Sequence, residues 1–110
     1  MKVSELIKIT GFTYGSGIDA PDREVKGCYI GDLLSLAMAK VDVYNVWFTI
    51  QTNINVVAVA SLKEAGCVII ADGFHIDEAV KAKAEAEEII ILETELSAYD
   101  IAKKLAELSI

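Results

Sequence analysis

Three short runs of consecutive apolar residues, each followed by a stretch with helical character, constrain the fold of this chain more than any other feature. The apolar runs cover 46–50, 67–71 and 89–92, and the helical stretches cover about 53–65, 77–88 and 96–108. Strands buried on both faces lose the polar and apolar alternation of a half-exposed strand. The pattern therefore predicts a single three-layer α/β/α domain over residues 1–110, with a mainly parallel sheet between helices.

The first 40 residues predict smaller elements. Residues 4–11 predict a short helix, and residues 12–14 and 25–30 predict strands. Asp32 is placed to cap a further short helix over 33–38.

The predicted helix 53–65 is apolar on all sides. Ile54, Val57 and Leu62 form one stripe, while Val56 and Val59 make the opposite side apolar as well. A helix of this kind needs two partners. One is the sheet, and the other is either the neighbouring helix 33–38 or a second copy of the chain, so a homodimer is expected as one of two solutions.

Length and charge exclude several classes of protein. The chain has 110 residues, which fits one domain, and its formal net charge is −7. An acidic chain repels phosphate backbones and anionic lipid, so neither nucleic acid nor a membrane is an expected partner. Two cysteines without CxxC spacing, no signal-peptide pattern and no apolar run long enough to span a bilayer predict a reduced, cytoplasmic protein.

The known motifs for catalysis and cofactors are weak here. Residues 15–20 match the letters G-x-G-x-x-A, but Pro21 follows and no helix opens there, so a turn is expected instead of a dinucleotide site. Asp72, His75 and Glu78 are expected to serve turns and helix caps. With His75 as the single imidazole, no catalytic residue, metal site or cofactor is predicted.

Polar residues gather after each of the three apolar runs. Parallel sheets bind ligands beyond the carboxyl ends of their strands, where helix N-termini present free N–H groups. The candidate ligand-binding residues at these ends are Gln51, Thr52, Asn53, Asp72, Thr94 and Ser97. Helix capping by Asn53 and Thr94 is the structural alternative.

Residues 22–35 begin with an Asp-Arg pair and resemble the DRTGG domain family. Three positions match the named motif: Asp22, Arg23 and Gly27. Cys28 stands in place of the second glycine. Three further stretches resemble stand-alone members of the family, so that the resemblance covers nearly the whole chain: 47–53, 56–62 and 94–99.

The resemblance implies a fold related to the N-terminal domain of HPr kinase, without that enzyme's catalytic P-loop domain. Members of the family also occur inside some phosphate acetyltransferases, beside CBS-type domain pairs, and as small proteins encoded near iron-hydrogenase genes. A non-catalytic regulatory or ligand-sensing domain is therefore implied, with a nucleotide or another small anion as its ligand. The alternative is a protein-interaction module that docks on itself or on a redox enzyme.

The Asp-Arg pair itself has two interpretations. In the first, Asp22 accepts local backbone N–H groups while the Arg23 guanidinium binds a carbonyl or carboxylate. In the second, Arg23 contacts a phosphate of the ligand. Arg23 is therefore a further candidate ligand-binding residue.

Overall fold

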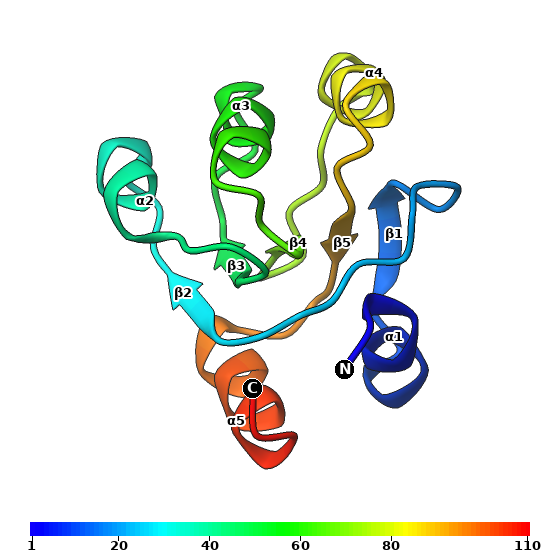
Figure 1. Ribbon diagram of the computed structural model, residues 1–110, viewed down its shortest axis with the longest axis vertical. Coiled ribbons are helices and arrows are strands. Elements are labelled where there is room, and N and C mark those ends of the chain that lie inside the picture. Colours follow the sequence, from blue (N-terminus) through cyan, green and yellow to red (C-terminus); the bar gives the residue numbers. More distant parts are fainter.

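The computed structural model describes all 110 residues and contains one five-stranded sheet with helices on both faces (Figure 1). In chain order the elements are α1 (Val3–Thr10), β1 (Thr13–Ser16), β2 (Cys28–Ile30), α2 (Leu34–Lys40), β3 (Val46–Thr49), α3 (Asn55–Leu62), β4 (Cys67–Ile70), α4 (Glu78–Ala86), β5 (Ile91–Glu93) and α5 (Ala98–Glu107). The predicted α/β/α architecture with a mainly parallel sheet is confirmed.

The strands lie in the order β1-β5-β4-β3-β2. Strands β2 to β5 are parallel, with Val46 opposite Cys67 and Ile70 opposite Glu93, while β1 runs antiparallel to β5. The three apolar runs therefore lie side by side and point the same way, as the sequence predicts.

The helices divide between the two faces of the sheet. Helices α2, α3 and α4 cover one face, and α1 and α5 cover the other (Figure 1). Helices α2, α3 and α4 each connect two neighbouring parallel strands. Each of these connections moves the chain one position along the sheet in the same direction. Since such crossovers share one hand, their helices share one face. Helix α5 follows the last strand and is free to pack on the opposite face.

The apolar runs supply both cores because successive side chains of a strand point to opposite faces. Trp47 and Ile70 pack beneath α2, α3 and α4, whereas Phe48 and Ile69 pack against α1 and α5. All four side chains are fully buried. Burial on both faces is the reason these strands show no polar alternation.

Helix α3 finds both of its partners within the chain. It lies between α2 and α4, and Val56 and Val59 are buried there together with Val57. The predicted stripe was partly wrong, because Ile54 and Leu62 are exposed. The apolar character of α3 is thus satisfied by the sheet and its neighbouring helices, and the homodimer stays a prediction.

Three of the predicted helix caps were wrong. Helix α2 begins after Leu33, while the Asp32 carboxylate accepts hydrogen bonds from Thr49 and Ile50 at the end of β3. The backbone N–H of Asp100 donates to Ser97, which therefore caps α5 in place of Thr94. Asn53 binds the N–H of Asn55 in the turn ahead of α3, whose N-cap is Ile54.

Within the glycine-rich segment 15–20, Gly15 and Ser16 extend β1, and the expected turn begins only at Gly17. Gly17 has a φ of +86°, and the N–H of Ala20 donates to its carbonyl oxygen. No helix opens there, since the next one begins at Leu34. None of the five helices has the length and apolar character needed to cross a membrane.

Candidate functional site

The connections that follow β4 and β5 diverge at the carboxyl edge of the sheet. Both loops start together, because the N–H groups of Asp72 and Gly73 donate to the carbonyl oxygens of Leu96 and Thr94, each at 2.9 Å. The chain from β4 then turns towards α4, and the chain from β5 turns towards α5 on the opposite face (Figure 1). Ligands of open α/β sheets bind in the crevice that such divergence creates.

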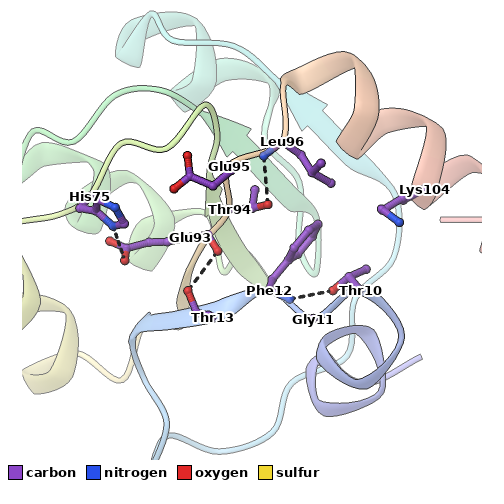
Figure 2. Close-up of a pocket in the computed structure, with 10 residues that line it drawn as sticks. All are labelled: Thr10, Gly11, Phe12, Thr13, His75, Glu93, Thr94, Glu95, Leu96 and Lys104. Carbon is purple, nitrogen blue, oxygen red and sulfur yellow. Dashed lines mark hydrogen bonds and ion pairs between the residues drawn. The ribbon is translucent and has the colours of Figure 1, made fainter.

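A cavity of about 420 Å³ lies at this place. It is formed by the α1–β1 connection, the β4–α4 loop, the β5–α5 loop and one side chain of α5 (Figure 2). The lining residues are Thr10, Gly11, Phe12, Thr13, His75, Glu93, Thr94, Glu95, Leu96 and Lys104. We call it the β5 cavity.

An ion pair stands at one side of the β5 cavity. The Nδ1 atom of His75 lies 2.9 Å from Oε1 of Glu93, and the N–H of Ile76 donates to Oε2 of Glu93 at 2.9 Å. Gly15 in β1 leaves the space that Glu93 needs, because a Cβ there would lie 3.0 Å from the carboxylate. The hydrogen bond to Glu93, followed by the negative charges of Glu93 and Glu95, raises the pKa of His75.

The hydroxyl groups of the cavity are already engaged with the backbone. Thr10 donates to the carbonyl oxygen of Leu6 at 2.8 Å, and Thr13 donates to that of Glu93 at 3.2 Å. Thr94 Oγ1 accepts from the N–H of Leu96 at 3.2 Å. Each hydroxyl oxygen still has acceptor capacity for a further partner.

The two remaining charged groups of the cavity have no partner in the chain. Glu95 and Lys104 are exposed and take part in no ion pair or side-chain hydrogen bond. In Figure 2 they lie on either side of Leu96. The cavity therefore offers a free carboxylate and a free ammonium group to a ligand.

Of the residues predicted from the sequence, Thr94 lines the β5 cavity. Asp72 begins the β4–α4 loop with an exposed side chain and a φ of +59°, and Ser97 serves as the cap of α5. Both belong to the two diverging loops, but neither lines the cavity.

The predicted residues after β3 lie apart from the cavity, because β4 separates β3 from β5 in the sheet. Their side chains serve the local turn: Gln51 Oε1 accepts from the N–H of Asn53 at 3.3 Å, and Asn53 Oδ1 accepts from the N–H of Asn55 at 2.8 Å. Thr52 forms no side-chain hydrogen bond within the chain. The ligand role of this segment stays a prediction.

Arg23 lies at the opposite end of the sheet. Its Nη2 atom donates to the carbonyl oxygen of Glu88 at 3.1 Å, as the structural interpretation of the Asp-Arg pair expects. Asp22 accepts from the N–H and the hydroxyl of Ser4 in α1, at 3.1 and 2.6 Å, and not from its own turn. These bonds lower the pKa of Asp22, the side-chain bond most. A ligand role for Arg23 stays a prediction.

Sequence reasoning missed most of the β5 cavity. Glu93 and Glu95 directly follow a predicted strand, which is a usable signal, but His75 was assigned to turn and cap chemistry. Lys104 and Thr10 carry no such signal, because they reach the cavity from helices at the two ends of the chain. No group of three or more His, Cys, Asp and Glu side chains lies close enough to hold a metal ion.

Neither thiol is activated as a nucleophile by its surroundings. Burial raises the pKa of Cys67 to about 12, and partial burial also raises the pKa of Cys28. The thiolate is the reactive form of cysteine, and both residues disfavour it.

The fold is a three-layer α/β/α domain with a crevice at the carboxyl edge of its sheet, and the comparisons bear on this fold. No protein-family model and no curated protein matches the chain. Among solved structures, it is similar to the crystal structure of the CBS and DRTGG domains of the regulatory region of Clostridium perfringens pyrophosphatase, complexed with the activator diadenosine tetraphosphate.

That similarity has a TM-score of 0.72 at 7% sequence identity and covers 92% of this chain. It supports the DRTGG-like fold that the sequence resemblance implies. The matched part makes up 44% of the other chain, so this chain spans less than half the length of that regulatory region.

Proposed function

We propose that this chain is a non-catalytic regulatory domain that senses a small ligand bound in the β5 cavity. The observation that carries the proposal is the position of this cavity, between two loops that leave neighbouring parallel strands towards opposite faces. A ligand there contacts segments from α1, β4, β5 and α5 at once. Binding therefore favours one arrangement of these segments, which is the physical basis of sensing.

A nucleotide is the ligand class that we favour. The similar pyrophosphatase region is complexed with a nucleotide activator, which supports this choice. The free ammonium of Lys104 suits a phosphate, and the free carboxylate of Glu95 suits the hydroxyl groups of a ribose. Thr94 adds a hydroxyl group to the same lining. Asp72, Ser97 and the segment 51–53 belong to the same edge of the sheet and extend the proposed site.

The absence of catalysis is part of the proposal. The single imidazole is held by Glu93, and the lining of the cavity includes no serine or cysteine. An activated nucleophile needs a base within hydrogen-bond reach, and His75 offers its remaining nitrogen to none of the lining hydroxyls.

The test is a thermal-shift titration with adenosine mono-, di- and triphosphates and diadenosine tetraphosphate. A nucleotide at 100 times its Kd stabilises the fold by about 2.7 kcal/mol. In a domain of this size, that raises the Tm by about 10 °C. We expect Lys104→Ala and Glu95→Gln to reduce the shift. Lys103→Ala is the matched control, because Lys103 lies over the ring of Tyr99 and does not line the cavity.

Two results would contradict the proposal: no nucleotide raises the Tm, or Lys104→Ala binds as tightly as Lys103→Ala. The double variant Thr52→Ala, Asn53→Ala separately tests the predicted β3 segment. If it weakens binding, the ligand extends from the β5 cavity along the edge of the sheet.

Self-association is the second candidate function. Strand β2 has a neighbour on one side only, and Cys28 and Ile30 are exposed on it. Leu33 and Leu36 next to it are 64% and 45% exposed. An open strand edge beside apolar side chains favours pairing with another chain.

Light scattering tests the homodimer. We expect a dimer that the Ile30→Lys variant dissociates, and a monomer at every concentration would eliminate the homodimer. Docking on a redox enzyme stays a prediction.

A further inference from the structure

A second cavity lies at the amino ends of the strands, opposite to the β5 cavity. Its volume is about 310 Å³. The lining residues are Arg23, Val43, Tyr44, Ala60, Ser61, Glu64, Ala65, Glu87 and Ile89. Arg23 lies in the segment ahead of β2, and the other residues precede β3, β4 or β5 or lie near the C-terminal ends of α3 and α4. We call it the Arg23 cavity.

Arg23 carries a buried donor without an acceptor. Its Nη2 atom binds the Glu88 carbonyl oxygen, but its Nε atom is buried and has no hydrogen-bond partner in the chain. It is the one buried side-chain nitrogen or oxygen atom in this condition. Buried polar groups are almost always paired, and an unpaired charged donor is costly. Arg23 lines the cavity, and the bond to Glu88 is the only hydrogen bond of its guanidinium in the chain, so the cavity favours a ligand that brings an acceptor oxygen to this guanidinium.

The rest of the cavity is acidic, which restricts the kind of acceptor. Glu64 is exposed at the rim and forms no ion pair, while Glu87 is paired with Lys83 at 2.9 Å. The C-terminal ends of α3 and α4, with their partial negative charge, lie at this end of the sheet. A multiply charged anion such as a phosphate is repelled there. A ligand that carries one carboxylate and one positive group is not repelled, because its positive group compensates the negative charge of Glu64.

We infer that the Arg23 cavity binds a small zwitterion of the amino-acid type. Its carboxylate accepts hydrogen bonds from the Arg23 guanidinium, and its ammonium group lies towards Glu64. Tyr44 and Ser61 supply hydroxyl groups for a polar side chain of the ligand. The volume falls within the range of small-molecule sites. This inference does not depend on the proposed function, since the two cavities lie at opposite ends of the sheet.

The chain offers a direct probe, because Arg23 is its only arginine. In this 110-residue chain labelled with ¹⁵N, the Nε–H group of Arg23 therefore gives a single NMR signal. We expect this signal to shift on addition of mixtures that contain the standard amino acids, and to shift much less with acetate, methylammonium or inorganic phosphate. No shift with any amino acid would overturn the inference. A larger shift with phosphate would also overturn it.

Variants separate the two ends of the ligand. Glu64→Gln should weaken binding of the amino acid about tenfold, because it removes the charge that faces the ammonium group. Glu78→Gln is the matched control, since Glu78 is exposed on α4 outside the cavity. Lys104→Ala should leave this binding unchanged, which distinguishes it from nucleotide binding at the β5 cavity. Equal binding by the Glu64→Gln and Glu78→Gln variants would refute the zwitterion.

Discussion

Thr49 is the polar residue at the end of β3 that holds the start of the following loop. Its side chain is 3% exposed. The hydroxyl donates to Asp32 Oδ1 at 2.6 Å, and its oxygen accepts from the N–H of Gln51 at 3.0 Å. The same carboxylate oxygen accepts from the N–H of Ile50 at 2.8 Å. The loop that carries the predicted β3 ligand residues is thus tied to the β2–α2 connection.

Thr49→Val keeps the volume and the branched shape of this side chain and removes both hydrogen bonds. The bond to the carboxylate is worth about 1.5 kcal/mol, the lower end for a charged acceptor, because Asp32 is exposed. The bond from Gln51 adds about 0.5 kcal/mol. The expected loss is about 2 kcal/mol of unfolding free energy, or roughly 8 °C in Tm.

Urea unfolding monitored by fluorescence measures this loss, since the single tryptophan, Trp47, is fully buried. Thr52→Val is the matched control and should be nearly neutral, because Thr52 forms no side-chain hydrogen bond. A double-mutant cycle with Asp32→Asn should give a coupling energy of about 1 kcal/mol. The reasoning is refuted if Thr49→Val costs no more than Thr52→Val, or if the cycle is additive.

Three further outcomes are expected. Gly66→Ala should destabilise the fold by about 2 kcal/mol, measured by the same urea unfolding, because a Cβ would lie 2.5 and 2.8 Å from two carbonyl oxygens; a neutral change would contradict this. NMR titration should show the pKa of His75 above 6.5, and Glu93→Gln should lower it. Since the pKa of His75 is raised in the folded state, the His75–Glu93 pair stabilises the fold fully below pH 6.5, and this stabilisation is lost as the pH rises through the pKa of the folded state. An unchanged His75 titration in the Glu93→Gln variant would contradict this prediction. A thiol reagent should modify Cys28 in the folded protein and Cys67 only after unfolding, because Cys67 is buried; two fast-reacting thiols would be inconsistent with the core.

The candidate site was predictable only where it is local. That ligands bind beyond the carboxyl ends of the strands follows from parallel topology, and the sequence placed Thr94 at such an end. The cavity, however, also needs His75 from the preceding loop and Lys104 from the last helix. A sequence pattern around either residue resembles ordinary turn or surface chemistry, so neither is distinguished before the chain is folded.

The sequence by itself determined which segments are buried, because buried segments consist of apolar residues. The apolar runs at Val46, Cys67 and Ile91 required a sheet covered on both faces, and this architecture followed without further information. The tertiary structure alone decided that β1 pairs antiparallel with β5, that α5 crosses to the face of α1, and that Arg23 lies at the other end of the sheet from the β5 cavity. These choices depend on the packing of segments far apart in the chain, where many small contacts sum to one arrangement and no single residue records the result.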